Sequence, residues 1–470
     1  MHSPSGSHGR NLAILIAAEA VQKVLTLALF VLISRGLSVE DNGRYALFTT
    51  LFPLMVVWIN MGMYDVAVRD IARDPGAAGR LVGGAFWPQA VLSLAAGLPI
   101  YLTTVFPETA FFLLILTVSM AAAMGRMCLA PFAAASRFGP PALLQVGLRA
   151  GVLVASVWVL SKGGGVLALI AVLLVPYFLW LLFAGIWMRR VIGLRSLPLP
   201  ISVAPYLLRQ GAPIAAGGLF ATLFFSMDLP LLGMHATPEA QGYYAMGARF
   251  MWMLFPLVDI LTSVVYPVLS RKVGGDDEGF ALGRVFRAAW LTGLPLAVGG
   301  AVLAGPLTVL LAGDKFLPGA YAVGGLTAAL ALFLLSSLAT VHLRAQGRQM
   351  VATVIMAAAC AAKALIILLA AGQGEALVAV NLALGVVIAV LLGVLAARSV
   401  AGFAWREAGD ALLRAAVAVL FMGLALWPLR DATPFLTIPL GAGVYLAAVL
   451  AFGAVDAWDR ALIRAAWRRT

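Results

Sequence analysis

The sequence predicts an all-α, polytopic membrane protein with about fourteen transmembrane helices. Hydrophobic residues make up 63% of the 470 residues, and Asp, Glu, Lys and Arg make up only 11%, whereas soluble domains carry about 25% of these charged types. Several charge-free runs reach membrane-spanning length, for example residues 81–107, 163–188, 288–313 and 316–343. Segments that are apolar on every face cannot be covered by one small core, so a water-soluble fold is excluded.

Clusters of charged and turn-forming residues divide the chain into fourteen apolar segments. In chain order we expect spans at about residues 11–34, 43–64, 81–106, 110–135, 141–161, 165–188, 207–234, 243–269, 285–312, 319–343, 350–371, 375–397, 411–429 and 434–455. The first span contains Glu19 and Lys23, and it is too long and too charged for the apolar stretch of a cleaved signal peptide.

The basic residues follow the alternation of these spans. If the N-terminus is cytoplasmic, 22 of the 32 Lys and Arg residues lie in inner connections and tails, five lie in outer connections, and five lie within spans. Basic residues near span ends are retained on the cytoplasmic side of a membrane. The sequence therefore predicts that both termini are cytoplasmic, and topology explains the net charge of +12 without a nucleic-acid partner.

Two nine-residue segments indicate an internal repeat. Residues 38–46 (SVEDNGRYA) and 237–245 (TPEAQGYYA) share Glu, Gly, Tyr and Ala at equal spacing, and each starts with a Ser or Thr that suits a helix N-cap. Phe-Pro-Leu follows in both halves, at 52–54 and 255–257. The repeat predicts two six-helix lobes, residues 1–200 and 201–400, and leaves residues 401–470 as an additional helix pair with a basic tail.

The same segments resemble a known family. Residues 37–45, Gly62 and residues 68–73 (VRDIAR) look like the start of polysaccharide flippases in the multidrug/oligosaccharidyl-lipid/polysaccharide exporter superfamily. Residues 237–244 and 266–271 (YPVLSR) resemble the second lobe of that family. The resemblance implies two lobes that face each other across a central cavity. Fourteen spans are closer to the count of peptidoglycan-precursor flippases than to the twelve spans of many O-antigen flippases.

The resemblance also implies a function and a location. A member of this family moves a lipid-linked oligosaccharide or polysaccharide precursor across the prokaryotic inner membrane by alternating access. Its partners would be a polyprenyl-pyrophosphate-linked glycan, membrane lipids, and a polysaccharide polymerase or glycosyltransferases.

Eight ionisable residues fall well inside the predicted spans. They are Glu19, Lys23, Arg126, Arg149, Asp228, Arg249, Asp259 and Lys363. Exposing all of them to lipid would cost on the order of 20 to 28 kcal/mol, because each charge near the centre of a helix costs roughly 2.5 to 3.5 kcal/mol. We therefore expect them to face the protein interior, a wet cavity or one another.

The basic members of this set outnumber the acidic ones. Glu19 with Lys23, and Asp228 with Arg249, match in depth and suit ion pairs, which leaves Arg126, Arg149 and Lys363 in need of counter-charge. A pyrophosphate would supply that charge, since guanidinium groups bind phosphate oxygens bidentately. We predict substrate contacts for Arg126, Arg149, Lys363, Lys23 and Arg249, with structural packing as the alternative.

The acidic members are candidates for ion coupling. Asp259 leads because Arg249 lies too far along the same helix to pair with it directly. Glu19 and Asp228 are weaker candidates, since each has a predicted basic neighbour. The alternative is that Asp259 meets Lys23 or Lys363 and only ties the lobes together.

Other chemistries find little support in the sequence. The four histidines are scattered, Cys128 and Cys360 sit alone in apolar segments, and no nucleotide-binding motif occurs, so we expect neither a metal nor a cofactor. The runner-up function is an ion-coupled multidrug or metabolite antiporter of the same superfamily, whose cavity would favour acidic and aromatic residues. A membrane glycosyltransferase would need paired carboxylates in a sizeable outer loop, and therefore we expect a transporter rather than an enzyme.

Overall fold

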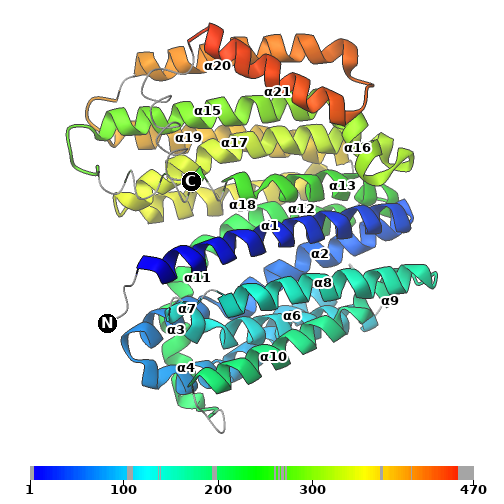
Figure 1. Cartoon of the computed structure of the whole chain (residues 1–470), viewed down its shortest axis with the longest axis vertical. Coiled ribbons are helices and arrows are strands. Elements are labelled where there is room, and N and C mark those ends of the chain that lie inside the picture. Colours follow the sequence, from blue (N-terminus) through cyan, green and yellow to red (C-terminus); the bar gives the residue numbers. More distant parts are fainter. Residues whose placement is uncertain are drawn as a thin grey trace. The chain divides into compact units, whose positions relative to one another are not determined.

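The computed structural model describes residues 5–102, 109–135, 137, 139–192, 198–234, 236–258, 261–262, 265, 269, 272–370, 374–403 and 405–453. Every element in these ranges is a helix, which confirms the predicted all-α class (Figure 1). The chain divides into two compact units, Met1–Glu239 and Ala240–Thr470. The predicted lobes, with boundaries at residues 200 and 400, stay a prediction.

The first unit contains twelve helices and two short 3₁₀ turns in its described part. In chain order these are α1 (Ser5–Gly36), α2 (Val39–Asn60), α3 (Met63–Arg73), η1 (Pro75–Ala77), α4 (Ala78–Gly84), α5 (Phe86–Leu102), α6 (Thr109–Cys128), α7 (Ala130–Ala134), α8 (Gly139–Ser161), α9 (Val166–Val172), α10 (Leu174–Ile192), η2 (Ile201–Val203), α11 (Ala204–Ser226) and α12 (Asp228–Gly233).

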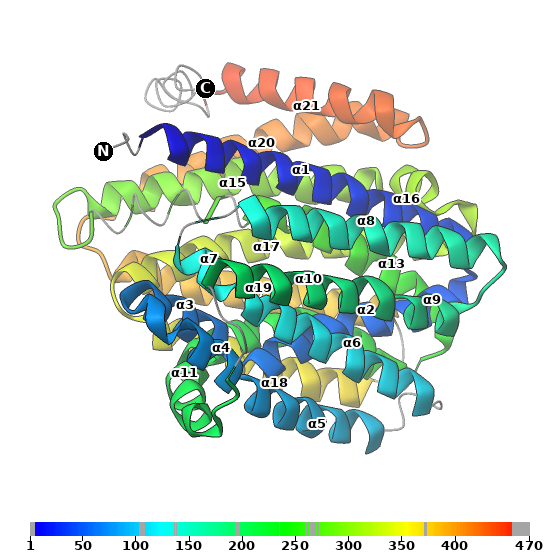
Figure 2. The same ribbon diagram turned by 60° about the horizontal axis from the view of Figure 1, so that its bottom comes forward.

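Long helices pack side by side in this unit. Figure 2 shows α1 running along α8, and α10 packs against both α6 and α8. The core between the helices is apolar, with Ile59, Phe132 and Leu169 fully buried. Close packing rather than the hydrophobic effect holds such helices together, because lipid tails are as apolar as the side chains.

The second span of this unit is broken. Ser38 caps α2 by accepting a 3.0 Å hydrogen bond from the backbone N–H of Asp41, as the sequence predicts. The helix ends at Asn60, since Met61 and Gly62 have φ values of +38° and +70°. Helix α3 then continues at an angle of 45° to α2. Only glycine adopts positive φ without strain, so Gly62 fixes the place of the break.

The second unit contains eight helices and two 3₁₀ turns in its described part. They are α13 (Pro238–Leu254), α15 (Glu278–Val302), α16 (Ala304–Ala312), η3 (Asp314–Gly319), α17 (Ala320–Ala345), α18 (Gln349–Ala370), α19 (Gly374–Arg398), α20 (Trp405–Leu426), η4 (Trp427–Leu429) and α21 (Pro434–Ala451).

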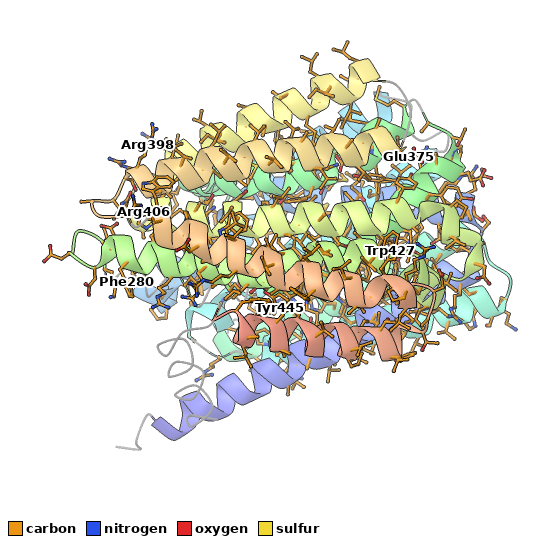
Figure 3. All side chains as sticks on the ribbon, turned by 90° about the horizontal axis from the view of Figure 1, so that it is seen from above. Phe280, Glu375, Arg398, Arg406, Trp427 and Tyr445 are labelled. Carbon is orange, nitrogen blue, oxygen red and sulfur yellow. The ribbon has the colours of Figure 1, made fainter. Side chains whose placement is uncertain are left out.

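Helix α17 lies at the centre of this unit and packs against α15 and α19. Helix α20 covers the other side of α15, and α21 packs against α20 (Figure 1). Figure 3 shows Arg398 and Arg406 at one end of the unit and Glu375 and Trp427 at the opposite end. Both basic residues therefore flank the same short connection between α19 and α20.

The described helices account for part of the predicted span count. Nine of them are long and apolar enough to cross a membrane, and ten if the bent pair α2 and α3 is one span. This confirms a chain that crosses the membrane many times, and the count of fourteen stays a prediction. Helix α13 ends at Leu254, shortly before Pro256, whereas α15 continues through Gly299 and Gly300 to Val302.

The two C-terminal helices satisfy a backbone group of α15. Pro295 lies inside α15 and has no N–H, so it cannot donate the helical hydrogen bond to the carbonyl of Leu291. The hydroxyl of Tyr445, on α21, donates a 2.8 Å hydrogen bond to that carbonyl instead. An unsatisfied carbonyl in hydrocarbon is costly. The helix pair that the sequence analysis treats as an appendage therefore completes the structure of α15.

Removing the Tyr445 hydroxyl tests this role. We expect Tyr445→Phe to lower the free energy of unfolding by about 1 to 3 kcal/mol, because it removes the donor to the partly buried Leu291 carbonyl. Pro295→Ala restores an N–H donor within α15, so Tyr445→Phe should cost less in that background. Thermal unfolding of the four purified proteins in detergent measures both effects. An equal cost in the two backgrounds would contradict the explanation.

The exposed connections test the predicted topology. Lys162 follows α8, Lys315 lies in η3, and Arg348 precedes α18; all three side chains are exposed. We expect single cysteines at 162 and 315 to react with an impermeant thiol reagent from outside intact cells, and a cysteine at 348 to react only after permeabilisation. The parent protein for these variants must lack Cys128 and Cys360. Labelling of position 348 from outside would contradict the predicted orientation.

Candidate functional site

Arg126 has the most exposed position among the predicted substrate-binding arginines. It lies near the end of α6, inside the candidate span Leu113–Ala134, and its side chain is exposed. Its guanidinium carbon lies 4.8 Å from the centre of the Tyr64 ring, a cation–π distance. Within the described part of the chain, no carboxylate forms an ion pair with Arg126. The positive charge is thus held by an aromatic face and remains accessible.

Arg149 lies on α8, where its side chain is partly buried. It lies close enough to Tyr177 on α10 to interact with it electrostatically. Arg149 on α8 and Arg126 on α6 thus lie on two helices that both pack against α10. Lys23 is exposed on α1, whereas the side chain of Glu19 lies outside the described residues, so their ion pair stays a prediction.

Lys363 has a different environment. Its side chain is completely buried in the second unit, and its Nζ donates a 2.8 Å hydrogen bond to Oδ1 of Asn381. The Asn381 amide nitrogen donates to the hydroxyl of Tyr244 at 3.1 Å and to the carbonyl of Leu377 at 3.0 Å. This network joins α18, α19 and α13. The environment of Lys363 therefore fits a role in structural packing better than a role in substrate binding.

The remaining candidates are spread over both units. Asp228 is buried at the start of α12 in the first unit, and Arg249 is partly buried on α13 in the second unit, so their ion pair stays a prediction. Asp259 lies outside the described residues. Among the residues that the structure does describe, no three His, Cys, Asp or Glu side chains form a group that could hold a metal ion.

Sequence reasoning missed three residues that organise these charges. Tyr64 lies at the end of the predicted span 43–64, and the sequence carries no signal that its ring contacts a cation. The sequence analysis includes Tyr244 only as the shared Tyr of the repeat and gives no role to Asn381. The signal for Asn381 is present, since it is the only amide in the otherwise apolar segment 376–397. An isolated amide in a membrane span needs an internal hydrogen-bonding partner.

A comparison of the sequence with models of known protein families identifies the family of the chain. The model described as "Polysaccharide biosynthesis protein" matches residues 32–321, which is more than half of the chain. The chain belongs to this polysaccharide biosynthesis protein family. The resemblance stated from residues 37–45 and 237–244 is therefore confirmed. None of the curated proteins matches the chain in sequence.

Solved structures show the same fold. The chain is similar to lipid II flippase MurJ in an inward closed conformation, with a TM-score of 0.71 and 16% identity over 94% of this chain and 98% of MurJ. It is also similar to an inward-facing MATE multidrug resistance transporter of the MOP superfamily, with a TM-score of 0.62 and 14% identity over 82% of this chain and 98% of the transporter. The eukaryotic MATE transporter AtDTX14 gives a TM-score of 0.55 and 15% identity over 86% of this chain and 97% of AtDTX14. The chain thus shares the fold of these membrane transporters.

The buried network at Lys363 gives a stability prediction. Lys363→Met should lower the free energy of unfolding by about 1 to 3 kcal/mol, because it removes the buried 2.8 Å hydrogen bond from Nζ to Asn381 Oδ1. The double variant Lys363→Met with Asn381→Leu should lose less than the sum of the two single variants. Thermal unfolding in detergent provides the measurement, with Arg398→Met at an exposed helix end as the control. Unchanged unfolding of Lys363→Met would show that the network contributes nothing.

Proposed function

We propose that this chain moves a polyprenyl-pyrophosphate-linked oligosaccharide from the inner to the outer leaflet of the inner membrane by alternating access. Family membership supports a role in polysaccharide biosynthesis. The similarity to the lipid II flippase MurJ extends over 94% of this chain, compared with 82% for the MATE transporter. Both termini would be cytoplasmic, and glycosyltransferases or a polymerase would act before and after transport.

The observation that carries the proposal is the exposure of the Arg126 guanidinium within a candidate membrane span. An exposed guanidinium at membrane depth is expensive, and in the described structure only the face of Tyr64 compensates it. A pyrophosphate would complete this site with charge-assisted, bidentate hydrogen bonds. Arg149 would add a second positive charge, while the polyprenyl tail stays in lipid.

The antiporter alternative uses the opposite charge. A carrier of cationic drugs needs accessible carboxylates within the membrane, whereas Asp228, one of the acids predicted inside spans, is buried in the described structure. The similarity of the fold to a MATE multidrug resistance transporter is the reason to test this alternative. A lipophilic cation therefore serves as the competing ligand in the test.

Binding of a short polyprenyl pyrophosphate to the purified protein in detergent tests the proposal. We expect Arg126→Gln to weaken binding tenfold or more, since hydrogen bonds between charged groups contribute about 1.5 to 3 kcal/mol. Arg149→Gln should act in the same direction, and Arg398→Gln, at an exposed helix end, should have no effect. A neutral polyprenol should bind weakly to all of them.

Two results would contradict this function. One is tight binding of a lipophilic cation with no binding of the pyrophosphate, which favours the antiporter. The other is that less Arg126→Gln protein reaches the membrane, while the protein that does reach it binds the pyrophosphate normally. That result would assign Arg126 a role in packing. Flipping of the labelled lipid in proteoliposomes then measures transport directly.

A further inference from the structure

Helix α3 begins in a backbone contact with α11. Gly62, at the break before α3, lies directly against Gly211 of α11. A Cβ atom added to Gly62 would collide with the Gly211 backbone, and one added to Gly211 would collide with the Met61 carbonyl. Neither position has room for a side chain. The start of α3 is therefore fixed to α11.

A second contact joins the other end of α3 to the same helix. The hydroxyl of Tyr206, on α11, donates a 2.6 Å hydrogen bond to Oδ2 of Asp70. Arg69 pairs with Oδ1 of Asp70 at 2.9 Å and also reaches the Tyr206 hydroxyl at 3.5 Å. Two independent contacts, one of backbone and one of polar side chains, thus hold α3 against α11.

Tyr64 lies on α3 between these two contacts, and its ring supports the guanidinium of Arg126. We propose that Tyr64 is a positioning residue that orients Arg126 toward an anionic headgroup, and that α11 holds Tyr64 in place through Gly211 and Tyr206. The inference rests on the proposed function, in which Arg126 binds the substrate pyrophosphate. Without the ring, the long Arg126 side chain samples many rotamers and loses its fixed direction.

The inference connects the substrate site with the helix that leads to the second unit. Helix α12 (Asp228–Gly233) follows α11 in the chain, and the first unit ends shortly after it, at Glu239. A displacement of α11 therefore moves Tyr64 and changes the orientation of Arg126.

Substitutions at Tyr64 separate positioning from a purely structural role. We expect Tyr64→Leu to weaken binding of the short polyprenyl pyrophosphate about three- to tenfold, the range of a cation–π contact, and Tyr64→Phe to restore most of it. In the Arg126→Gln background, Tyr64→Leu should cause no further loss. Trp158→Leu, which removes an exposed aromatic side chain from α8, is the matched control. Additive losses from Tyr64→Leu and Arg126→Gln would overturn the proposal.

A second measurement needs no substrate. Phenylglyoxal modifies accessible arginine side chains, and peptide mass spectrometry reports the rate at Arg126 in the ligand-free protein. We expect a severalfold faster rate in Tyr64→Leu, a smaller increase in Tyr206→Phe, and the parent rate in Tyr64→Phe. Equal rates in the parent, Tyr64→Leu and Tyr206→Phe would overturn the positioning role. Arg126→Gln could bind the pyrophosphate normally while the phenylglyoxal rates at Arg126 still differ between the parent and Tyr64→Leu. In that case the proposed function fails, but Tyr64 still positions Arg126.

Discussion

The hydrocarbon core of a membrane offers no hydrogen-bonding partner, and this constraint governs the whole chain. Helices satisfy it within each segment, which is why every described element is helical. The informative places are those where a helix cannot satisfy all of its own hydrogen-bonding groups. At Pro295 the missing N–H is replaced by the Tyr445 hydroxyl from another helix. The same constraint explains why the buried ammonium of Lys363 donates to the Asn381 amide oxygen, while the amide nitrogen of Asn381 donates in turn to the Tyr244 hydroxyl.

Charges in the two units illustrate two solutions to the same energetic problem. Lys363 is removed completely from solvent and receives a fixed acceptor from Asn381. Arg126 stays exposed and rests on the ring of Tyr64. The first solution places the ammonium where solvent does not reach it, whereas the second leaves the guanidinium group exposed. Exposure and the nature of the partner therefore distinguish two cations that look equivalent in the sequence.

The sequence was sufficient for the fold class because hydrophobicity and charge placement act over whole segments. It also predicted the Ser38 cap and the family, since both rest on short local patterns. The partners of the buried charges were not predictable in this way. Lys363 and Asn381 belong to different helices, and the depth of a residue in a span does not give the direction in which its side chain points. Gly62 was noted as part of a motif, but its contact with Gly211 depends on tertiary packing.

The contact between Gly62 and Gly211 also bears on how such a protein can be assembled from parts. Helices α2 and α3 are synthesised long before α11, so the surface around Gly62 stays uncovered until the later helix enters the membrane. Chimeras that exchange the halves of related chains between α10 and α11 would pair Gly62 with a foreign helix. Chimeras joined after α12 keep both glycines from the same parent. The stretch of chain from α2 to α11 must therefore come from one parent if this backbone contact is to be kept.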